Sequence, residues 1–286
     1  MPWKAKKSDI QLNHRVKQMI IIGELINASR KTIGAAIREK DAGIVRDTAS
    51  QQAEHGASYI DVNAGIFLDD EPEYLSWLVE NVQAVTDVPC AIDSPNPKAI
   101  EAALALHGGA TPMINSISLE SDRWENMLPI VAGTDLKVVA LCMSDEGMPQ
   151  TVDDRMRISD KLVNGLVQNN VRLENIFIDP LVQPLGVNKE FGMQFLDSIE
   201  RITTQFAGIH TACGLSNISY GLPGRKHINR AFMTIAVTRG LDGAILNPLD
   251  KGMRAAIALG EALAGKDDFC MKYLKAFRAG LFEATA

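Results

Sequence analysis

The sequence predicts a single (β/α)8 TIM barrel, an α/β fold in which eight parallel strands alternate with helices. Eight short apolar segments alternate along the chain with segments of helical spacing, a pattern typical of parallel α/β folds. No linker or change in composition divides the 286 residues, and barrels often reach this length as one domain. We therefore expect an N-terminal extension over residues 1–18 and one barrel domain over residues 19–286.

The eight expected strands are short apolar runs, as strands covered on both faces are. A doubly wound open sheet, the alternative, usually carries a glycine-rich phosphate turn after an early strand. The first strand instead continues Ile22-Gly23-Glu24, which disfavours that alternative. We expect strands at residues 19–23, 59–63, 90–92, 112–114, 136–143, 176–178, 209–213 and 243–246.

Capping signals between these strands predict the helix boundaries. Pro72 suits the first turn of a helix in which Leu75 and Leu78 begin an apolar stripe. Thr151 and Asp154 have the spacing of a capping box at the start of a long helix. Other helices are expected to begin near residues 41, 96, 227, 251 and 267, and glycines at positions 56 and 108–109 are expected to follow helix ends.

The composition excludes several classes of function. A net charge of −6 and a pI near 5.4 argue against nucleic acid as a partner, because binding phosphates needs a clustered basic surface. The one basic run, residues 4–7, is interpreted as a solvated arm. No apolar run reaches the roughly 18 residues needed to span a bilayer, and no signal-peptide pattern is present. We expect a cytoplasmic protein that does not bind membranes.

Cysteine and histidine spacing gives no sign of a metal site. No C-x-x-C pair occurs, and three of the cysteines fall in expected strands, where buried thiols are the ordinary interpretation. We therefore expect neither a disulfide framework nor a protein-bound metal. The residues are Cys90, Cys142, Cys213 and Cys270, with histidines at His14, His55, His107, His210 and His227.

Polar side chains end almost every expected strand. In a barrel the C-terminal ends of the strands meet on one face, and chemistry is done there. Any single polar tip is equally well explained as a helix cap, but seven of the eight tips end in Asp, Glu or Asn, and only the fifth, at Met143-Ser144, does not. The tip residues are Glu24, Asn27, Asp61, Asn63, Asp93, Asn115, Asp179, Ser216, Asn217 and Asn247.

The chemistry of these tips limits the ligand. Carboxylates accept paired N–H groups, and amides both donate and accept, so the set favours a neutral, flat heterocycle with a guanidine-like edge. A phosphorylated sugar would need basic groups near the seventh and eighth strands. Schiff-base chemistry would need a lysine at a strand tip. Neither is present, which argues against aldolase-like functions.

The stretch from Cys213 to Arg230 is unusually rich in directional hydrogen-bonding groups. Glycines, a proline, hydroxyls, amides and two guanidinium groups follow an apolar strand within about a dozen residues. On its own this stretch fits a loop that caps the next helix as well as it fits a binding loop.

Six segments in matching order resemble the pterin-binding methyltransferases. These barrel enzymes move a methyl group between N5 of tetrahydrofolate and the cobalt of a corrinoid. The resemblance covers nearly the whole chain after the N-terminal extension. The segments are residues 21–27 (IIGELIN), 60–65 (IDVNAG), 92–94 (IDS), 113–116 (MINS), 178–181 (IDPL) and 214–219 (GLSNIS).

The resemblance implies roles for individual residues. Asp179 would accept both the 2-amino group and the N3–H of the pterin, while Asp93 and Asn115 complete its hydrogen bonds. Asn217 would lie near N5 and assist transfer. The implied catalytic residues are Asn217, Asp93 and Asn115, and the implied folate-binding residues are Glu24, Asn27, Asp61, Asn63, Asp93, Asn115, Asp179, Gly214, Ser216, Asn217 and Arg225.

The resemblance also implies the partners. The substrate would be tetrahydrofolate, with methyl transfer favoured from methylcobalamin to folate and with a homodimer as the assembly. The 286 residues contain no D-x-H-x-x-G, the corrinoid-binding signature of the family's partner domains. The corrinoid would therefore arrive free, as methylcobalamin, or on a separate corrinoid protein. Arg225, Asn229 and Arg230 would face the corrinoid or the folate tail.

Two residues depart from the family pattern, and two alternative functions stay open. Leu25 stands where relatives commonly have arginine, and Ser144 stands where the corrinoid-protein enzyme has asparagine. One alternative is a dihydropteroate synthase, although its first-strand loop reads N-V-T-P-D-S-F whereas this chain reads NASRKT at residues 27–32. The other is a non-catalytic folate-binding subunit.

Overall fold

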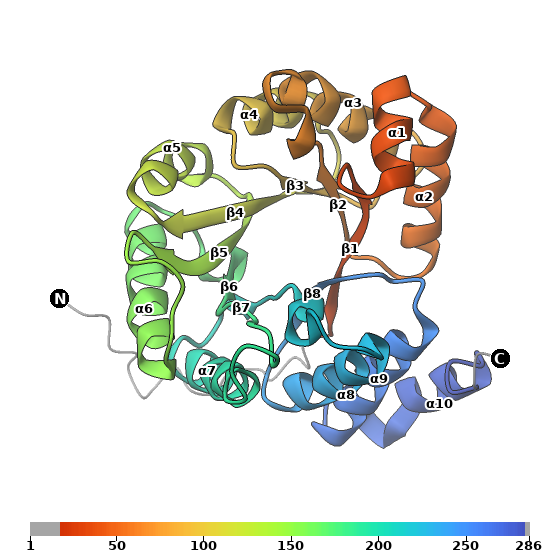
Figure 1. Ribbon diagram of the computed structural model, residues 1–286, viewed down its shortest axis with the longest axis vertical. Coiled ribbons are helices and arrows are strands. Elements are labelled where there is room, and N and C mark those ends of the chain that lie inside the picture. The colour runs from red at the N-terminus through yellow and green to blue at the C-terminus, as the bar shows by residue number, and fades with distance from the viewer. Residues whose placement is uncertain (1–17, 284–286) are drawn as a thin grey trace.

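The computed structural model describes residues 18–283 and contains eight parallel strands inside a ring of helices (Figure 1). Neighbouring strands pair in the order β7-β6-β5-β4-β3-β2-β1-β8. The expected barrel is therefore confirmed, while residues 1–17 lie outside the described part. The strands are β1 (Ile20–Asn27), β2 (Tyr59–Asn63), β3 (Cys90–Asp93), β4 (Met113–Leu119), β5 (Lys137–Ser144), β6 (Ile176–Asp179), β7 (His210–Thr211) and β8 (Gly243–Leu246).

Most helices begin where the capping signals predict, but the helix expected near residue 267 begins at Met271. Asp41 and Asn96 accept backbone N–H groups of the following turn, and Thr151 and Asp154 form a reciprocal capping box. The helices are α1 (Lys31–Glu39), α2 (Ala42–Glu54), α3 (Glu71–Gln83), α4 (Pro97–Leu106), α5 (Ser121–Val131), α6 (Val152–Gln168), α7 (Phe191–Gln205), α8 (Arg225–Thr238), α9 (Lys251–Leu263) and α10 (Met271–Arg278). Short 3-10 helices are η2 (Gly65–Asp70), η3 (Leu173–Asn175), η4 (Leu215–Ser219) and η5 (Asp268–Cys270).

Three strand boundaries and one loop differ from the sequence prediction. The first strand, expected to end at residue 23, continues to Asn27. The seventh strand, expected over residues 209–213, is regular only at His210–Thr211. The fourth strand, expected to end at residue 114, continues to Leu119. The polar stretch after Cys213 is not an open loop but begins with η4. The Ser219 hydroxyl donates to the Ser216 carbonyl and accepts from Arg225 Nε, which lets the chain turn tightly.

The barrel closes between β7 and β8 through a few specific contacts. A parallel bridge joins Gly214 to Ile245, whose N–H donates to the Cys213 carbonyl at 2.9 Å. Below this bridge the Asp242 carboxylate accepts the N–H of Thr211 at 2.7 Å. Gly243 leaves room for this approach, because a Cβ there would lie 2.7 Å from the Thr211 carbonyl oxygen.

The inside of the barrel contains a cluster of buried apolar side chains, which we call the inner layer. The layer draws one residue from each of six strands or strand extensions, and alternate residues on the same strands pack outward against the helices. Three expected strand thiols, Cys90, Cys142 and Cys213, are buried as predicted. The inner layer consists of Ile22, Ala91, Met113, Val139, Phe177 and Ala212.

Replacing Gly243 by alanine should destabilise the protein, because the new methyl group would force β7 and β8 apart. We expect a loss of about 1 to 3 kcal/mol in the free energy of unfolding, measured by urea denaturation. Gly108→Ala is the matched control, since its Cβ would meet only the Gln83 side chain at 3.7 Å. Equal stabilities of the two variants would contradict this account of closure.

Candidate functional site

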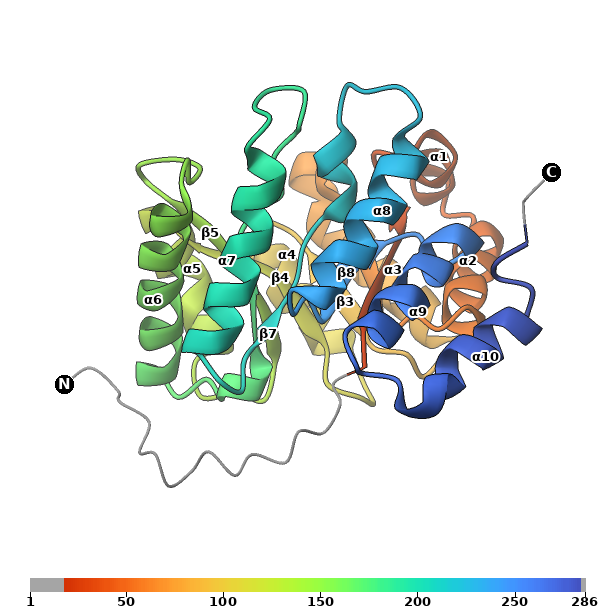
Figure 2. The same cartoon turned by 90° about the horizontal axis from the view of Figure 1, so that it is seen from below.

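Five of the predicted site residues lie on the inward face at one end of the barrel. Asp93, Asn115 and Asp179 each follow an inner-layer residue by two positions, and side chains two apart on a strand share a face. Glu24 and Gly214 stand in the same relation to Ile22 and Ala212. The loops that follow the strands project from this end, at the top of Figure 2.

Four tip residues of β2, β3 and β4 contact one another directly. Asn63, Asp93 and Asn115 are in register on three adjacent strands. The amide of Asn63 donates to Asp93 Oδ2 at 2.9 Å, and the amide of Asn115 donates to Asp61 Oδ1 at 3.1 Å. These two amide–carboxylate pairs form what we call the β2–β4 cluster: Asp61, Asn63, Asp93 and Asn115.

The carboxyl groups of the β2–β4 cluster hold protons more tightly than usual. Burial raises the pKa of Asp61 well above its ordinary value, and the negative charge of Asp93 adds to the rise, against the hydrogen bond from Asn115. Burial also raises the pKa of Asp93 to about 6, although the Asn63 hydrogen bond and the Arg123 charge lower it. Asp93 can therefore gain or lose a proton near neutral pH.

Asp179 ends β6 on another side of the barrel mouth. It is almost fully buried, with 5% of its surface exposed, and its Oδ1 accepts the N–H of Leu181 at 2.8 Å. Burial raises the pKa of Asp179 to about 7, while hydrogen bonds from the backbone of Leu181 and Gly214 and the charge of Arg155 oppose the rise. A carboxyl so placed favours a ligand that brings its own donors.

The 3-10 helix η4 carries Ser216 and Asn217, and Arg225 holds it in place. Arg225 Nη2 donates to the Ser216 carbonyl at 2.7 Å, and Nε donates to Ser219 Oγ at 3.0 Å. Asn217 is exposed, and a Cβ on Gly214 would lie 3.3 Å from its Nδ2. Arg225, predicted as a folate ligand, thus has its Nε and Nη2 engaged in bracing η4.

The tips of β1, β7 and β8 line a cavity of about 280 Å³. Glu24 forms an ion pair with Arg30 at 2.7 Å within this region. Asn27 is nearby in sequence but accepts the N–H and hydroxyl of Ser29, so its Oδ1 stabilises the local turn. The lining residues are Glu24, Ser216, Arg225, Lys226, Asn229, Leu246, Asn247, Asp250 and Met253.

Two residues that sequence reasoning missed support the tips. Glu71 accepts the Ser94 hydroxyl at 2.7 Å behind Asp93. Arg155 is buried beneath the segment that follows β6. A signal for Arg155 exists in the sequence, because it is in phase with Ser159, Leu162 and Leu166 on the buried stripe of α6.

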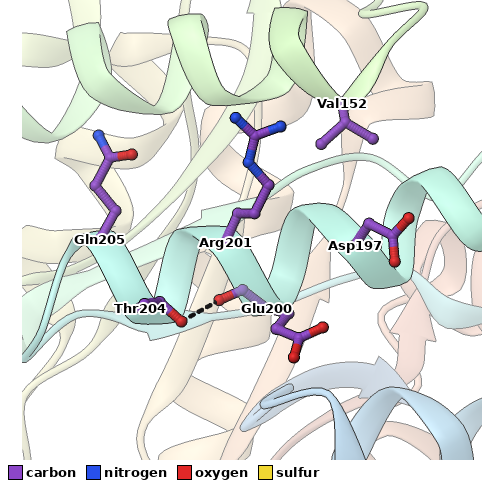
Figure 3. Close-up of a pocket in the computed structure, with 6 residues that line it drawn as sticks. All are labelled: Val152, Asp197, Glu200, Arg201, Thr204 and Gln205. Atoms are coloured by element: carbon purple, nitrogen blue, oxygen red, sulfur yellow. Dashed lines mark hydrogen bonds between the residues drawn. The ribbon is translucent and has the colours of Figure 1, made fainter.

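One other hollow lies away from this constellation. A groove of about 520 Å³ runs between α6 and α7 on the outer layer, where Figure 3 shows Arg201, Asp197 and Glu200 on its lining. It contains none of the predicted site residues. Within residues 18–283 no group of three or more His, Cys, Asp or Glu could hold a metal ion. Among the helices that the structure describes, none has the length and apolar character of a membrane span.

The chain is similar in sequence to folate and corrinoid enzymes. It is 38% identical over 264 residues to the methylcorrinoid:tetrahydrofolate methyltransferase of Eubacterium limosum, which covers 92% of this chain and 97% of that protein. The methionine synthases of Mycobacterium leprae and Mycobacterium tuberculosis are 27% identical over 242 residues, 80% of this chain but 20% of their own length.

Solved structures and a family model complete the comparison. The dihydropteroate synthase of Xanthomonas albilineans in complex with 7,8-dihydropteroate has a TM-score of 0.67 at 19% identity, over 87% of this chain and 94% of that one. At such identity the likeness shows the fold alone. The model for pterin binding enzymes matches residues 23–247. This chain therefore belongs to the family of pterin binding enzymes.

Proposed function

We propose that this protein is a methyltransferase that moves a methyl group between a corrinoid and N5 of tetrahydrofolate. The observation that carries the proposal is the 38% identity, across 97% of its length, to a methylcorrinoid:tetrahydrofolate methyltransferase. The ring of carboxylates and amides at the barrel mouth supports it, since these groups suit the donor and acceptor edge of a pterin.

Asp179 is the proposed anchor of the pterin. Its ionised carboxylate would accept the 2-amino and N3–H groups, an arrangement of two parallel hydrogen bonds that fixes the plane of the ring. The β2–β4 cluster would bind the remaining polar atoms of the pterin, and Gly214 and Ser216 would shape the pocket wall. Glu24, Asn27 and Arg225 are proposed as outer folate contacts.

The chemistry at N5 requires a proton to be handled near neutral pH. When the methyl group passes from cobalt to the N5 lone pair, cobalt keeps the electron pair of the broken bond and N5 loses its proton. In the reverse direction N5 must be protonated or hydrogen-bonded before it can leave. Asp93, with a pKa raised to about 6, suits this role. Asn217 and Asn115 would stabilise the charge that changes on N5.

The corrinoid is proposed to be supplied in trans, free or on a separate corrinoid protein. No residue encodes the direction of transfer, and we favour methylcobalamin to tetrahydrofolate because the similar relative carries the name of a methylcorrinoid enzyme. A cytoplasmic homodimer whose residues 19–286 act as one domain is part of the same proposal. A dihydropteroate synthase activity, the alternative reaction, would release pyrophosphate from a pterin pyrophosphate.

Mixing the protein with methylcobalamin and tetrahydrofolate should change the absorption spectrum of the cobalamin, because loss of the methyl group leaves reduced cobalt. The assay is followed in both directions, with free cobalamin and with corrinoid proteins. The absence of any enzyme-dependent change, combined with measurable tetrahydrofolate binding, would instead support a non-catalytic folate-binding subunit.

Asp179→Ala should weaken tetrahydrofolate binding by about 2 to 3 kcal/mol, because two donors of the pterin lose their partner. Wild-type affinity should also rise with pH and level off above about 7, where Asp179 becomes ionised. Calorimetric titration across pH measures both. Glu146→Ala, which removes an exposed carboxylate paired with Arg157, is the control and should bind normally.

Asn217→Ala should lower kcat by about 10²-fold while changing tetrahydrofolate affinity much less, because its hydrogen bond would strengthen as charge changes on N5. Stopped-flow kinetics separate the two quantities. The exposed amide of Asn188, on the loop after β6, gives the matched control Asn188→Ala. Equal losses in affinity and turnover would reduce Asn217 to a binding residue.

A further inference from the structure

Arg155 is a fully buried arginine that forms no ion pair within residues 18–283. Its exposure is 0%, and it lies on the core-facing stripe of α6. A buried guanidinium is costly unless its N–H groups are hydrogen-bonded. The hydrogen bonds of the guanidinium must therefore compensate for its burial.

The guanidinium joins three segments of the chain. Nε donates to the Pro180 carbonyl at 2.8 Å, and Nη2 donates to Gln183 Oε1 at 3.2 Å and to the Leu181 carbonyl at 3.5 Å. Nη1 donates to the Thr151 carbonyl at 3.1 Å and to Gln194 Oε1 at 3.4 Å. Three of these five hydrogen bonds are thus made to residues 180–183, directly after β6.

That segment presents one of the two backbone N–H groups that act on Asp179, the other being that of Gly214. Leu181 has a φ of +63°, a conformation that costs a non-glycine residue about 1 kcal/mol or more and persists only when its surroundings hold it. In this conformation the Leu181 N–H points at Asp179 Oδ1, at 2.8 Å. By fixing the carbonyls on both sides of the Leu181 N–H, Arg155 fixes its direction.

Arg155 is also the positive charge that acts on Asp179. Its charge lowers the pKa of Asp179 against the effect of burial. The other ionisable groups that face Asp179 are the thiols of Cys142 on β5 and Cys213 after β7, and burial raises the pKa of both. They remain neutral near pH 7, so removing Arg155 would leave no cation among residues 18–283 to stabilise the carboxylate.

We propose that Arg155 is a positioning residue for pterin binding, which holds the segment after β6 so that Asp179 presents an oriented, ionised carboxylate to the ligand. The inference rests on the proposed function, because it assumes that Asp179 binds the pterin. Arg155 itself would not contact the ligand. It would affect binding only by orienting Asp179 and stabilising its charge.

The test compares Arg155→Met and Arg155→Lys by tetrahydrofolate titration across pH. Arg155→Met should move the pH at which affinity levels off upward by about one unit, and so weaken binding at pH 7 by about fivefold. Arg155→Lys keeps the charge but loses the fork of donors, so its pH midpoint should stay near that of the wild type while affinity falls severalfold. Arg157→Met, an exposed arginine of the same helix, should behave as wild type.

A double variant separates positioning from mere stability. If Arg155 acts through Asp179, then Arg155→Met should change affinity little in an Asp179→Asn background. Additive losses, or an unchanged pH midpoint in folded Arg155→Met, would overturn the proposal. If Arg155→Met does not fold, Gln183→Leu removes one acceptor of the guanidinium, and wild-type affinity in that variant would overturn it.

Failure of the proposed function gives a different result. A wild-type protein that does not bind tetrahydrofolate, or one in which Asp179→Asn binds it normally, contradicts the pterin role of Asp179. Normal folate binding by the wild type, loss in Asp179→Asn and no pH shift in Arg155→Met contradict only the role of Arg155.

Discussion

The burial of carboxyl groups at the mouth of the barrel is the constraint on which the rest of the site depends. Asp61 and Asp179 have lost almost all contact with water, and a buried carboxylate is costly unless donors surround it. The amide of Asn115 for Asp61, and the N–H of Leu181 with the charge of Arg155 for Asp179, supply part of that need. Asn63 and Arg123 do the same for the neighbouring Asp93. A ligand rich in N–H groups would supply the rest.

The burial of Asp179 makes the stability of the folded protein depend on pH. The folded protein holds a proton on Asp179 up to a pKa of about 7, whereas the unfolded chain releases it near 4. The folded state therefore binds more protons than the unfolded state across this window, and the free protein loses stability as the pH rises through it. Tetrahydrofolate, by pairing with the carboxylate, would reverse the loss. The ionisation of Asp179 thus affects both the stability of the free protein and its affinity for the ligand.

The fold could be predicted from the sequence because its signals are local. Apolar runs and capping residues such as Asn96 and Thr151 act within one turn or one strand, and the tip residues followed once the strands were placed. The contacts were not predictable in the same way. That Asn63 meets Asp93, or that Arg155 reaches Pro180 across 25 residues, depends on strand register and helix rotation. The shortening of β7 likewise depends on Asp242 and Gly243, far along the chain.

Proton release on ligand binding tests the account most directly. Titration of the protein with tetrahydrofolate at about pH 6.5, in two buffers of different ionisation enthalpy, measures the protons exchanged. The account predicts release of a large fraction of one proton by the wild type, much less above about pH 8, and none of this release by Asp179→Asn. Tight binding without proton release at the lower pH would contradict the claim that the pterin binds to an ionised, buried Asp179.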